Sequence, residues 1–288
     1  MKFNDLLSSF VNTTKIDYDS TKNYITYLGE MNNSQNAIIK IQKTLIKENQ
    51  QLKEINFHKD LDLKFVNDIF KNYSNEDFYV ETVYPASTND ITKYSQHEEV
   101  QILETPFMYQ NIVLPYINNL PSTHFSWIYN ILDHITEEEN RILDFENGLN
   151  GFMVMKDYKH KCKEPGDFYL NILAKNRSIK SIRDLTANEL PLLQESLTKG
   201  LQVSEQIFHI DKPYLRFFIH YHPTFYHFHI HVVHTSIITR GIGIGRANLL
   251  TDVIDNLKDN SDYYKKKVMT ATIIPDSNLG QSLLKECK

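Results

Sequence analysis

The sequence predicts an α+β fold that combines antiparallel sheets with helices. Short segments with alternating apolar residues predict strands, and longer runs with helical spacing follow them along the chain. The 288 residues are enough for one large domain or two ordinary ones. No segment reaches the roughly 18 consecutive apolar residues of a membrane span, so we expect no membrane partner.

Composition and charge limit the kinds of ligand and the cellular compartment that we expect for this protein. The formal net charge is −5, so a long nucleic acid is not expected, whereas a short anionic ligand held by local Lys, Arg and His side chains is compatible with the sequence. The two cysteines, Cys162 and Cys287, have no metal or redox spacing, which argues against a disulfide framework and indicates a reducing compartment. Residues 1–15 lack the apolar run of a signal peptide. We therefore expect the protein in the cytoplasm, with the nucleus as a second compartment.

The first part of the chain differs in composition from the rest. It is polar and contains two strand-like segments, 36–41 and 78–84. The composition changes weakly near residue 96. We predict a smaller N-terminal domain over residues 1–96 and a larger C-terminal domain over residues 97–288.

The next segments read as helices. The spacing is helical from Ile91 to about Glu104, with Glu104 expected on the solvated face, and Pro106 is expected to end this helix. A second helix is expected to begin near Phe125. Thr186 and Glu189 form a capping box before a long helix that ends by Pro213. The other expected elements are strands over 152–155, 169–174, 214–219 and 227–233, and a helix over 247–257.

The predicted strand 227–233 carries the most informative pattern. His227, His229 and His231 alternate with Phe228, Ile230 and Val232. Alternate side chains of a strand share one face, so three imidazoles are expected on one face and three apolar groups on the other. Imidazole titrates near neutrality, and such a row can attack, donate protons and bind anions.

Three interpretations of this row compete. It could be an exposed polar strand face, although three histidines at alternate positions are unusual for such a face. It could be a zinc site, but histidines four residues apart on a strand lie roughly 13 Å apart, and each ligand nitrogen must lie about 2.0 Å from the metal. The third interpretation, which we favour, is a nucleophilic histidine between two phosphate-binding histidines.

The pattern also resembles a known family. Residues 227–233 fit His-φ-His-φ-His-φ-φ, with φ apolar, which is the signature of the histidine-triad (HIT) superfamily. Four blocks in order are similar to scavenger mRNA-decapping enzymes within this superfamily, over about residues 90–285. They are residues 127–133, 181–193, 215–231 and 245–257.

The resemblance implies a fold, a partner and a reaction. The fold is a HIT-type antiparallel sheet with helices, preceded by a smaller N-terminal α+β domain that is exchanged between the subunits of a homodimer. The substrate is 7-methylguanosine cap dinucleotide or a short capped RNA. The reaction is hydrolysis of the triphosphate bridge to 7-methyl-GMP and a diphosphate, without a metal or another cofactor.

The resemblance also implies the catalytic residues. His229 is the nucleophile, and attack by its imidazole would form a phosphohistidyl intermediate that water then cleaves. His227, His231 and His220 are placed to stabilise the charge on the phosphoryl oxygens. The related reactions of dinucleoside polyphosphate hydrolases, and a cap-binding regulator with little turnover, are the alternatives.

The cap-binding residues follow from the same blocks. Trp127, the only tryptophan, would stack on the cationic methylated guanine, and Glu137 or Glu138 would accept from its N1 and N2 donors. Phe225 stands where the family usually has a tyrosine. The remaining implied contacts to the ligand are Asp157, Lys159, Lys93, Arg246 and Thr224.

Overall fold

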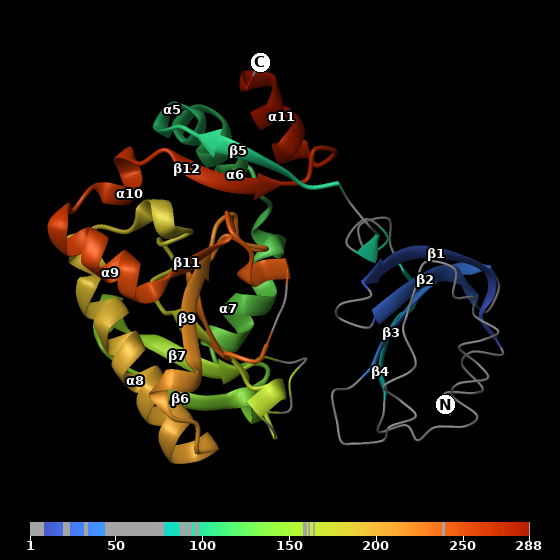
Figure 1. The fold of residues 1–288 in the computed structure, drawn as a ribbon, viewed down its shortest axis with the longest axis horizontal. Coiled ribbons are helices and arrows are strands. Elements are labelled where there is room, and N and C mark those ends of the chain that lie inside the picture. Colours follow the sequence, from blue (N-terminus) through green and yellow to red (C-terminus); the bar gives the residue numbers. More distant parts are fainter. Residues whose placement is uncertain are drawn as a thin grey trace. The chain divides into compact units, whose positions relative to one another are not determined.

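The computed structural model describes residues 9–19, 24–31, 34–43, 78–86, 91, 94–95, 98–157, 160, 162–163, 165–237 and 240–287. The chain divides into two compact units, Met1–His97 and Glu98–Lys288 (Figure 1). Among the described helices, none is both long enough and apolar enough to cross a membrane.

The N-terminal unit is built on a four-stranded antiparallel sheet with the strand order β1-β2-β3-β4. Ile25, Ile39 and Ile41 are fully buried and lie on one face of this sheet, and Ile38 is fully buried on the opposite face. The two strands expected from the sequence correspond to β3 and β4. The strands are β1 Val11–Asp19, β2 Tyr24–Met31, β3 Gln35–Lys43 and β4 Phe78–Val83.

The C-terminal unit contains a six-stranded sheet with the order β11-β9-β10-β8-β7-β6. Every neighbouring pair is antiparallel, which confirms the predicted α+β class with antiparallel sheets. The strands are β6 Arg141–Phe145, β7 Phe152–Lys156, β8 Tyr169–Ala174, β9 Leu215–His220, β10 His229–His234 and β11 Ala247–Leu249.

Helices flank this sheet. The helices α8 (Leu190–Phe208) and α9 (Leu250–Asp259) lie on one side of it, and α7 (Ser126–Leu132) lies on the other (Figure 1). The capping box of Thr186 and Glu189 is confirmed directly before α8. The shorter helices are α5 Pro106–Met108, a π-helical turn Tyr109–Val113, α6 Leu114–Asn118, α10 Tyr263–Lys266 and α11 Asn278–Glu286.

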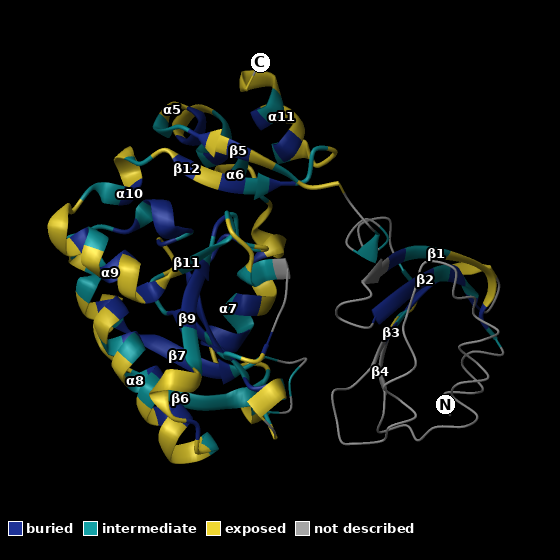
Figure 2. Ribbon diagram, in the orientation of Figure 1, coloured by how far each residue is buried: buried dark blue, intermediate teal, exposed yellow. Residues whose placement is uncertain are grey.

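The helix α8 packs closely on the sheet because it carries a glycine at the contact. A Cβ atom on Gly200 would lie 2.5 Å from Cε1 of Phe217 and 3.2 Å from Cδ1 of Ile172. Phe217 of β9 and Ile172 of β8 therefore face α8. Their partners across the strands are Val232 and Ile230 of β10, which are buried in the same core. The apolar residues between the histidines thus face the helix, and the histidines face away from it. Figure 2 shows β7 as mostly buried, whereas α8 has both buried and exposed residues.

The helix predicted from Ile91 to Glu104 is wrong at its C-terminal end. Val100–Glu104 is a strand, β5, which pairs with β12 (Met269–Ile273) in a separate two-stranded antiparallel sheet. A partner about 170 positions later in the chain cannot be recognised from local spacing, because tertiary context overrides propensity. Pro106 begins α5 and does not end a helix, since the first turn needs no amide from proline.

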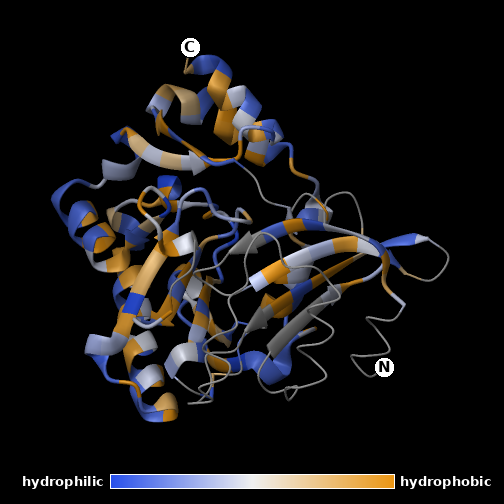
Figure 3. Cartoon of the chain, turned by 45° about the vertical axis from the view of Figure 1, so that its right-hand side comes forward, coloured by the Kyte–Doolittle hydropathy of each residue, from blue (hydrophilic) through white to orange (hydrophobic). Residues whose placement is uncertain are grey.

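The predicted helix 247–257 is wrong only at its start. Ala247–Leu249 pairs with β9 as strand β11, and α9 begins at Leu250. The buried residues of α9 are Leu250, Val253, Ile254 and Leu257, at helical spacing. Figure 3 shows that the helices carry both hydrophobic and hydrophilic residues, as is typical of helices that pack against a core with one face.

Glu104 is not solvated as predicted, but lies in a fully buried polar cluster. Arg183 donates to its Oε1 from Nη2 at 2.6 Å and from Nε at 3.1 Å, and the Tyr221 hydroxyl donates to the same oxygen at 2.5 Å. Nε2 of His222 lies 2.9 Å from Oε2. Burial raises the pKa of Glu104, but the contacts with His222, Tyr221 and Arg183 outweigh it and the net pKa is lowered. The cluster therefore contains a carboxylate that is held as an anion.

This cluster connects segments that are distant in the chain. Glu104 ends β5, Arg183 precedes α8, and Tyr221 and His222 follow β9. Nη1 of Arg183 also donates to the carbonyl oxygens of Tyr264 at 2.7 Å and Lys267 at 2.6 Å. The guanidinium is therefore saturated with acceptors, as a buried cation requires.

We predict that Glu104→Gln strongly destabilises the protein, because Arg183 would remain as a buried charge without its partner. The loss of a single member of a buried ion pair costs about 3–5 kcal/mol. A shift of the urea unfolding midpoint measures this loss. The matched control is Glu138→Gln, which removes an exposed partner of Arg141 and should cost less than about 1 kcal/mol. Equal shifts for both variants would contradict the prediction.

Candidate active site

The three histidines of the sequence pattern are gathered at the start of β10. His229 and His231 are strand residues, whereas His227 lies just before the strand, so the predicted strand 227–233 begins two residues too early. The exposed fractions of the three residues are 0%, 4% and 8% in chain order. The ring centroids of His229 and His231 are 4.7 Å apart, and that of His220 from β9 is 4.3 Å from His231. The histidine cluster, meaning His220, His227, His229 and His231, is therefore a contiguous group.

Backbone carbonyls determine which nitrogen carries the proton in two of these rings. Nε2 of His227 lies 2.8 Å from the carbonyl oxygen of Ala174, and Nδ1 of His229 lies 2.8 Å from the carbonyl oxygen of His227. A carbonyl oxygen only accepts, so each of these nitrogens must be the protonated one. Neutral His229 consequently has its lone pair on Nε2, the nitrogen that can act as a nucleophile.

Burial keeps the cluster neutral. It lowers the pKa of His220, His227 and His229 to about 4 in each case, and it lowers the pKa of His231 as well. Near pH 7 the imidazoles are therefore uncharged. An uncharged imidazole has the free lone pair that nucleophilic attack requires.

Phe225 links His229 to Trp127. Its ring stacks on His229 with centroids 4.3 Å apart and an interplanar angle of 15°, and it contacts Trp127 edge-on at 4.8 Å. Trp127 is 46% exposed, so it is not a core residue and its ring is accessible to a ligand. The sequence singled out Phe225 only for its missing hydroxyl, and its stacking on His229 was not anticipated.

Arg246 lies beside His220. The backbone carbonyl of Arg246 accepts from the amide of Tyr221 at 2.8 Å, and Ala247 pairs with His220 across β11 and β9. Nη2 of Arg246 forms an ion pair with Oε1 of Glu99 at 2.8 Å. The pKa of His220 is lowered mainly by burial, to a smaller extent by His229, and then by the charge of Arg246. The structure therefore brings this predicted cation next to the histidine cluster.

The strand β8 contributes residues that sequence reasoning missed. Asn171 pairs with His231 across the strands, and its Nδ2 donates to Oδ2 of Asp157 at 3.1 Å. The hydroxyl of Tyr169 lies 3.0 Å from Nδ1 of His231. Tyr169 and Asn171 are alternate residues of the predicted strand 169–174, and this alternation was the available signal. The register depends on tertiary structure: it places Asn171 opposite His231 and Tyr169 opposite Val233.

The other residues predicted to contact the ligand have no described contact with the histidine cluster or lie outside the described residues. Glu137 accepts from Nδ2 of Asn140 at 3.3 Å and is half-buried, whereas Glu138 is exposed and paired with Arg141. Thr224 is exposed between β9 and β10. No described contact joins these three residues to the histidine cluster. Lys93 and Lys159 lie outside the described residues.

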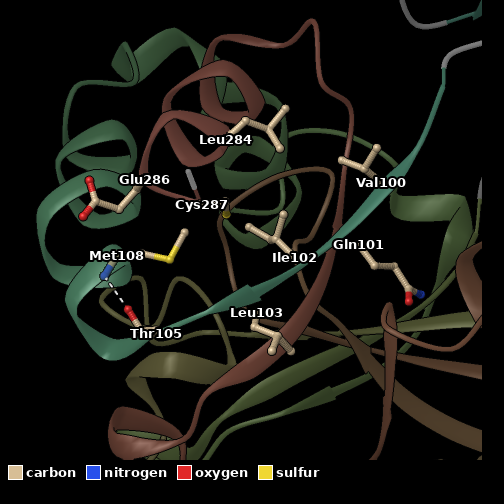
Figure 4. A pocket seen from close by; sticks show the side chains of 9 residues that line it. All are labelled: Val100, Gln101, Ile102, Leu103, Thr105, Met108, Leu284, Glu286 and Cys287. Carbon is tan, nitrogen blue, oxygen red and sulfur yellow. Dashed lines mark hydrogen bonds between the residues drawn. The ribbon is translucent and has the colours of Figure 1, made fainter.

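A separate hollow lies away from the histidines. It has a volume of about 440 Å³ between β5, α5 and α11, and it contains none of the predicted site residues (Figure 4). It is lined by Val100, Gln101, Ile102, Leu103, Thr105, Met108, Leu284, Glu286 and Cys287. Over the described part of the chain, no group of three or more His, Cys, Asp and Glu side chains is placed to hold a metal ion.

The described geometry supports phosphoryl transfer to His229. Its Nε2 is unprotonated in the neutral ring, neighbouring rings can supply donors, and the exposed indole of Trp127 lies one aromatic ring away. A neutral nucleophile among buried donors suits attack on an anionic phosphorus centre.

Two family models match the chain. The model described as scavenger mRNA decapping enzyme (DcpS) N-terminal matches residues 5–97, and the model described as scavenger mRNA decapping enzyme C-term binding matches residues 126–244. These matches confirm the resemblance seen in the sequence.

Similar proteins from three organisms carry the same name, m7GpppX diphosphatase. The relative from Bos taurus is 30% identical over 287 residues, which cover 95% of this chain and 85% of the relative. The relative from Schizosaccharomyces pombe is 33% identical over 261 residues, covering 86% of each chain. The relative from Ascaris suum is 38% identical over 212 residues, covering 72% of this chain and 70% of the relative. The chain belongs to the scavenger mRNA decapping enzyme family.

Proposed function

We propose that the protein is a scavenger decapping hydrolase that cleaves the triphosphate bridge of 7-methylguanosine cap dinucleotide or short capped RNA. The observation that carries the proposal is the buried His229, whose Nδ1 donates to a carbonyl and whose Nε2 is therefore the free nucleophile. The names of the relatives, m7GpppX diphosphatase, agree with this chemistry.

The reaction proceeds in two displacements. Nε2 of His229 forms a bond to the phosphorus next to the methylated nucleoside, and the bond from that phosphorus to the bridging oxygen breaks. The nucleoside or oligonucleotide diphosphate leaves with the electron pair. Water then cleaves the N–P bond, which yields 7-methyl-GMP and restores His229. One difficult displacement thus becomes two easier ones.

The neighbouring residues have supporting roles in this proposal. His220 and His231 lie beside the nucleophile and supply donors to the phosphoryl oxygens, with the cationic Arg246 next to His220. His227 has a different role. Its Nε2–H donates to the carbonyl oxygen of Ala174, and its own carbonyl oxygen accepts from His229 and orients that ring. Asp157, Lys159, Lys93 and Thr224 are proposed as further contacts to the ligand.

The methylated base would be recognised by Trp127 together with one glutamate. Methylation at N7 makes guanine cationic, and tryptophan is the best aromatic partner for a cation. Of the two candidate glutamates, Glu137 is favoured because it is half-buried and not paired with a cation, whereas Glu138 is exposed and engaged by Arg141. Carboxyl-to-amide variants of both residues in a cap-binding titration would separate them.

The assembly and location are also proposals. We infer a homodimer in which the N-terminal domain, residues 1–96, is exchanged between subunits and acts as a lid over the catalytic domain, residues 97–288. A closed lid would exclude water and leave room only for a short RNA. The protein would act in the cytoplasm and the nucleus.

Two other functions are tested by the same assays. A dinucleoside polyphosphate hydrolase would cleave uncharged adenine substrates as well as the methylated cap, although such bases gain less from the exposed Trp127. A cap-binding regulator would bind the cap with negligible turnover.

We predict that His229→Asn lowers the turnover of cap dinucleotide by roughly a thousandfold or more, as the loss of a nucleophile does. Asparagine keeps a polar side chain but cannot form the phosphoryl adduct, so the affinity for the cap should stay within a few-fold. Product chromatography and a fluorescence titration measure the two effects. Turnover above a few per cent of wild type would refute the role of His229.

We predict that activity is lost in acid near pH 4 and not near the ordinary histidine value of about 6.5. Burial lowers the pKa of His229 to about 4, so the nucleophile stays neutral above that value and is lost as pH falls through it. The pH profile of kcat/KM measures this.

A folding control is needed for the same profile. A histidine whose pKa is lowered by folding binds fewer protons in the folded state than in the unfolded state. The free energy of unfolding therefore decreases as the pH falls from about 6.5 to about 4, by roughly 1.4 kcal/mol per pH unit for each such histidine. Circular dichroism at each pH identifies the range in which the protein is folded. An acid limb near pH 6.5 in folded protein would contradict the prediction.

We predict that Trp127→Ala weakens binding of a methylated cap analogue about tenfold or more, because a desolvated cation–π contact contributes about 2 kcal/mol. The unmethylated analogue should lose much less, since its guanine is uncharged. Parallel titrations with both analogues measure the difference. Equal losses would show that Trp127 acts only through packing against Phe225.

A further inference from the structure

The tautomer of His231 is not determined by a backbone carbonyl. In His227 and His229 a carbonyl oxygen requires the proton on the facing nitrogen. In His231 the partner of Nδ1 is the Tyr169 hydroxyl, at 3.0 Å, and a hydroxyl can either donate or accept. The position of the His231 proton therefore depends on a side chain.

The surroundings of Tyr169 favour donation by the phenol. Burial and, to a smaller extent, the negative charge of Asp157 raise its pKa, so the phenol keeps its proton. Within the described residues, its hydroxyl forms a hydrogen bond only with His231. If Nδ1 carried the imidazole proton, the phenol proton would lack an acceptor, and the loss of a buried hydrogen bond is costly.

The opposite arrangement satisfies both groups. When the phenol donates to Nδ1, the proton of neutral His231 resides on Nε2, which is buried and has no hydrogen-bond partner among the described residues. The Tyr169 ring is held for this contact, because it stacks on His160 at 4.9 Å and meets the His231 ring edge-on at 5.6 Å. An N–H group without a partner in the described part of the chain is thus available in the ring next to His229.

We propose that Tyr169 is a positioning residue for the hydrolysis, which presents Nε2–H of His231 to an oxygen of the phosphoryl group that His229 attacks. The proposal rests on the proposed function of the histidine cluster. The other tautomer would direct a lone pair at an anionic oxygen and repel it. A donor that is in place before the reaction stabilises the charge that develops at phosphorus.

The test is Tyr169→Phe, which removes the hydroxyl and keeps the ring. We expect kcat on cap dinucleotide to fall roughly three- to tenfold, the size of one net hydrogen bond, with KM changed less than about twofold. The matched control is Tyr264→Phe, because this buried hydroxyl accepts from Nδ2 of Asn256 at 3.0 Å and no described contact joins it to the histidine cluster. The control should leave kcat unchanged.

Nitrogen NMR of histidine-labelled protein reports the tautomer without turnover. The His231 signals are identified by their loss in His231→Gln. Wild type should show an unprotonated Nδ1 that accepts a hydrogen bond, and Tyr169→Phe should move this nitrogen to the shift of a free lone pair or show a mixture of tautomers.

The outcomes separate the two proposals. A protonated Nδ1 of His231 in wild type, or a kcat of Tyr169→Phe within twofold of wild type, would overturn the role of Tyr169. If the variant does not fold by circular dichroism, the wild-type spectrum alone decides the tautomer. An inactive wild type with the expected spectrum would refute the proposed function, while the tautomer assignment would be supported.

Discussion

The hydrogen bond from Nδ1 of His229 to the carbonyl oxygen of His227 is the contact on which the proposed chemistry of this site depends. It is 2.8 Å long and buried, and it leaves the lone pair of neutral His229 on Nε2, the nitrogen that the proposed mechanism uses. His227, whose carbonyl accepts this hydrogen bond, is itself held because its ring donates from Nε2 to the carbonyl oxygen of Ala174. Because both bonds involve main-chain oxygens, the tautomers follow from the path of the backbone, and desolvation keeps the rings neutral.

The backbone path around the site is held by a buried charge cluster. Glu104 contacts Arg183, Tyr221 and His222, and the Tyr226 hydroxyl lies 3.0 Å from Nδ1 of His222. These contacts anchor the segment between β9 and β10 at both of its ends. Phe225, which stacks on His229, is a neighbour of Tyr226 in that segment. A network of this kind fixes one loop conformation only when each polar member is paired.

Local patterns in the sequence predicted a large part of the fold and the centre of the site. The alternating histidines marked β10, the capping box marked the start of α8, and the family resemblance identified Trp127 before its exposure was known. The errors have a common cause. Val100–Glu104 and Ala247–Leu249 form strands only because partners distant in the chain pair with them, and local spacing carries no information about such partners.

The sequence by itself determined the α+β class, the alternation that separates the histidines from the apolar residues of β10, and the family. Periodicity and residue type are local properties, so they can be recognised from the sequence alone. Only the tertiary structure decided that Glu104 is buried against Arg183, that Phe225 covers His229, and that Tyr169 reaches His231. These contacts depend on strand register and on loop paths, and a shift of one residue in the register of β8 would turn Tyr169 to the opposite face of the sheet.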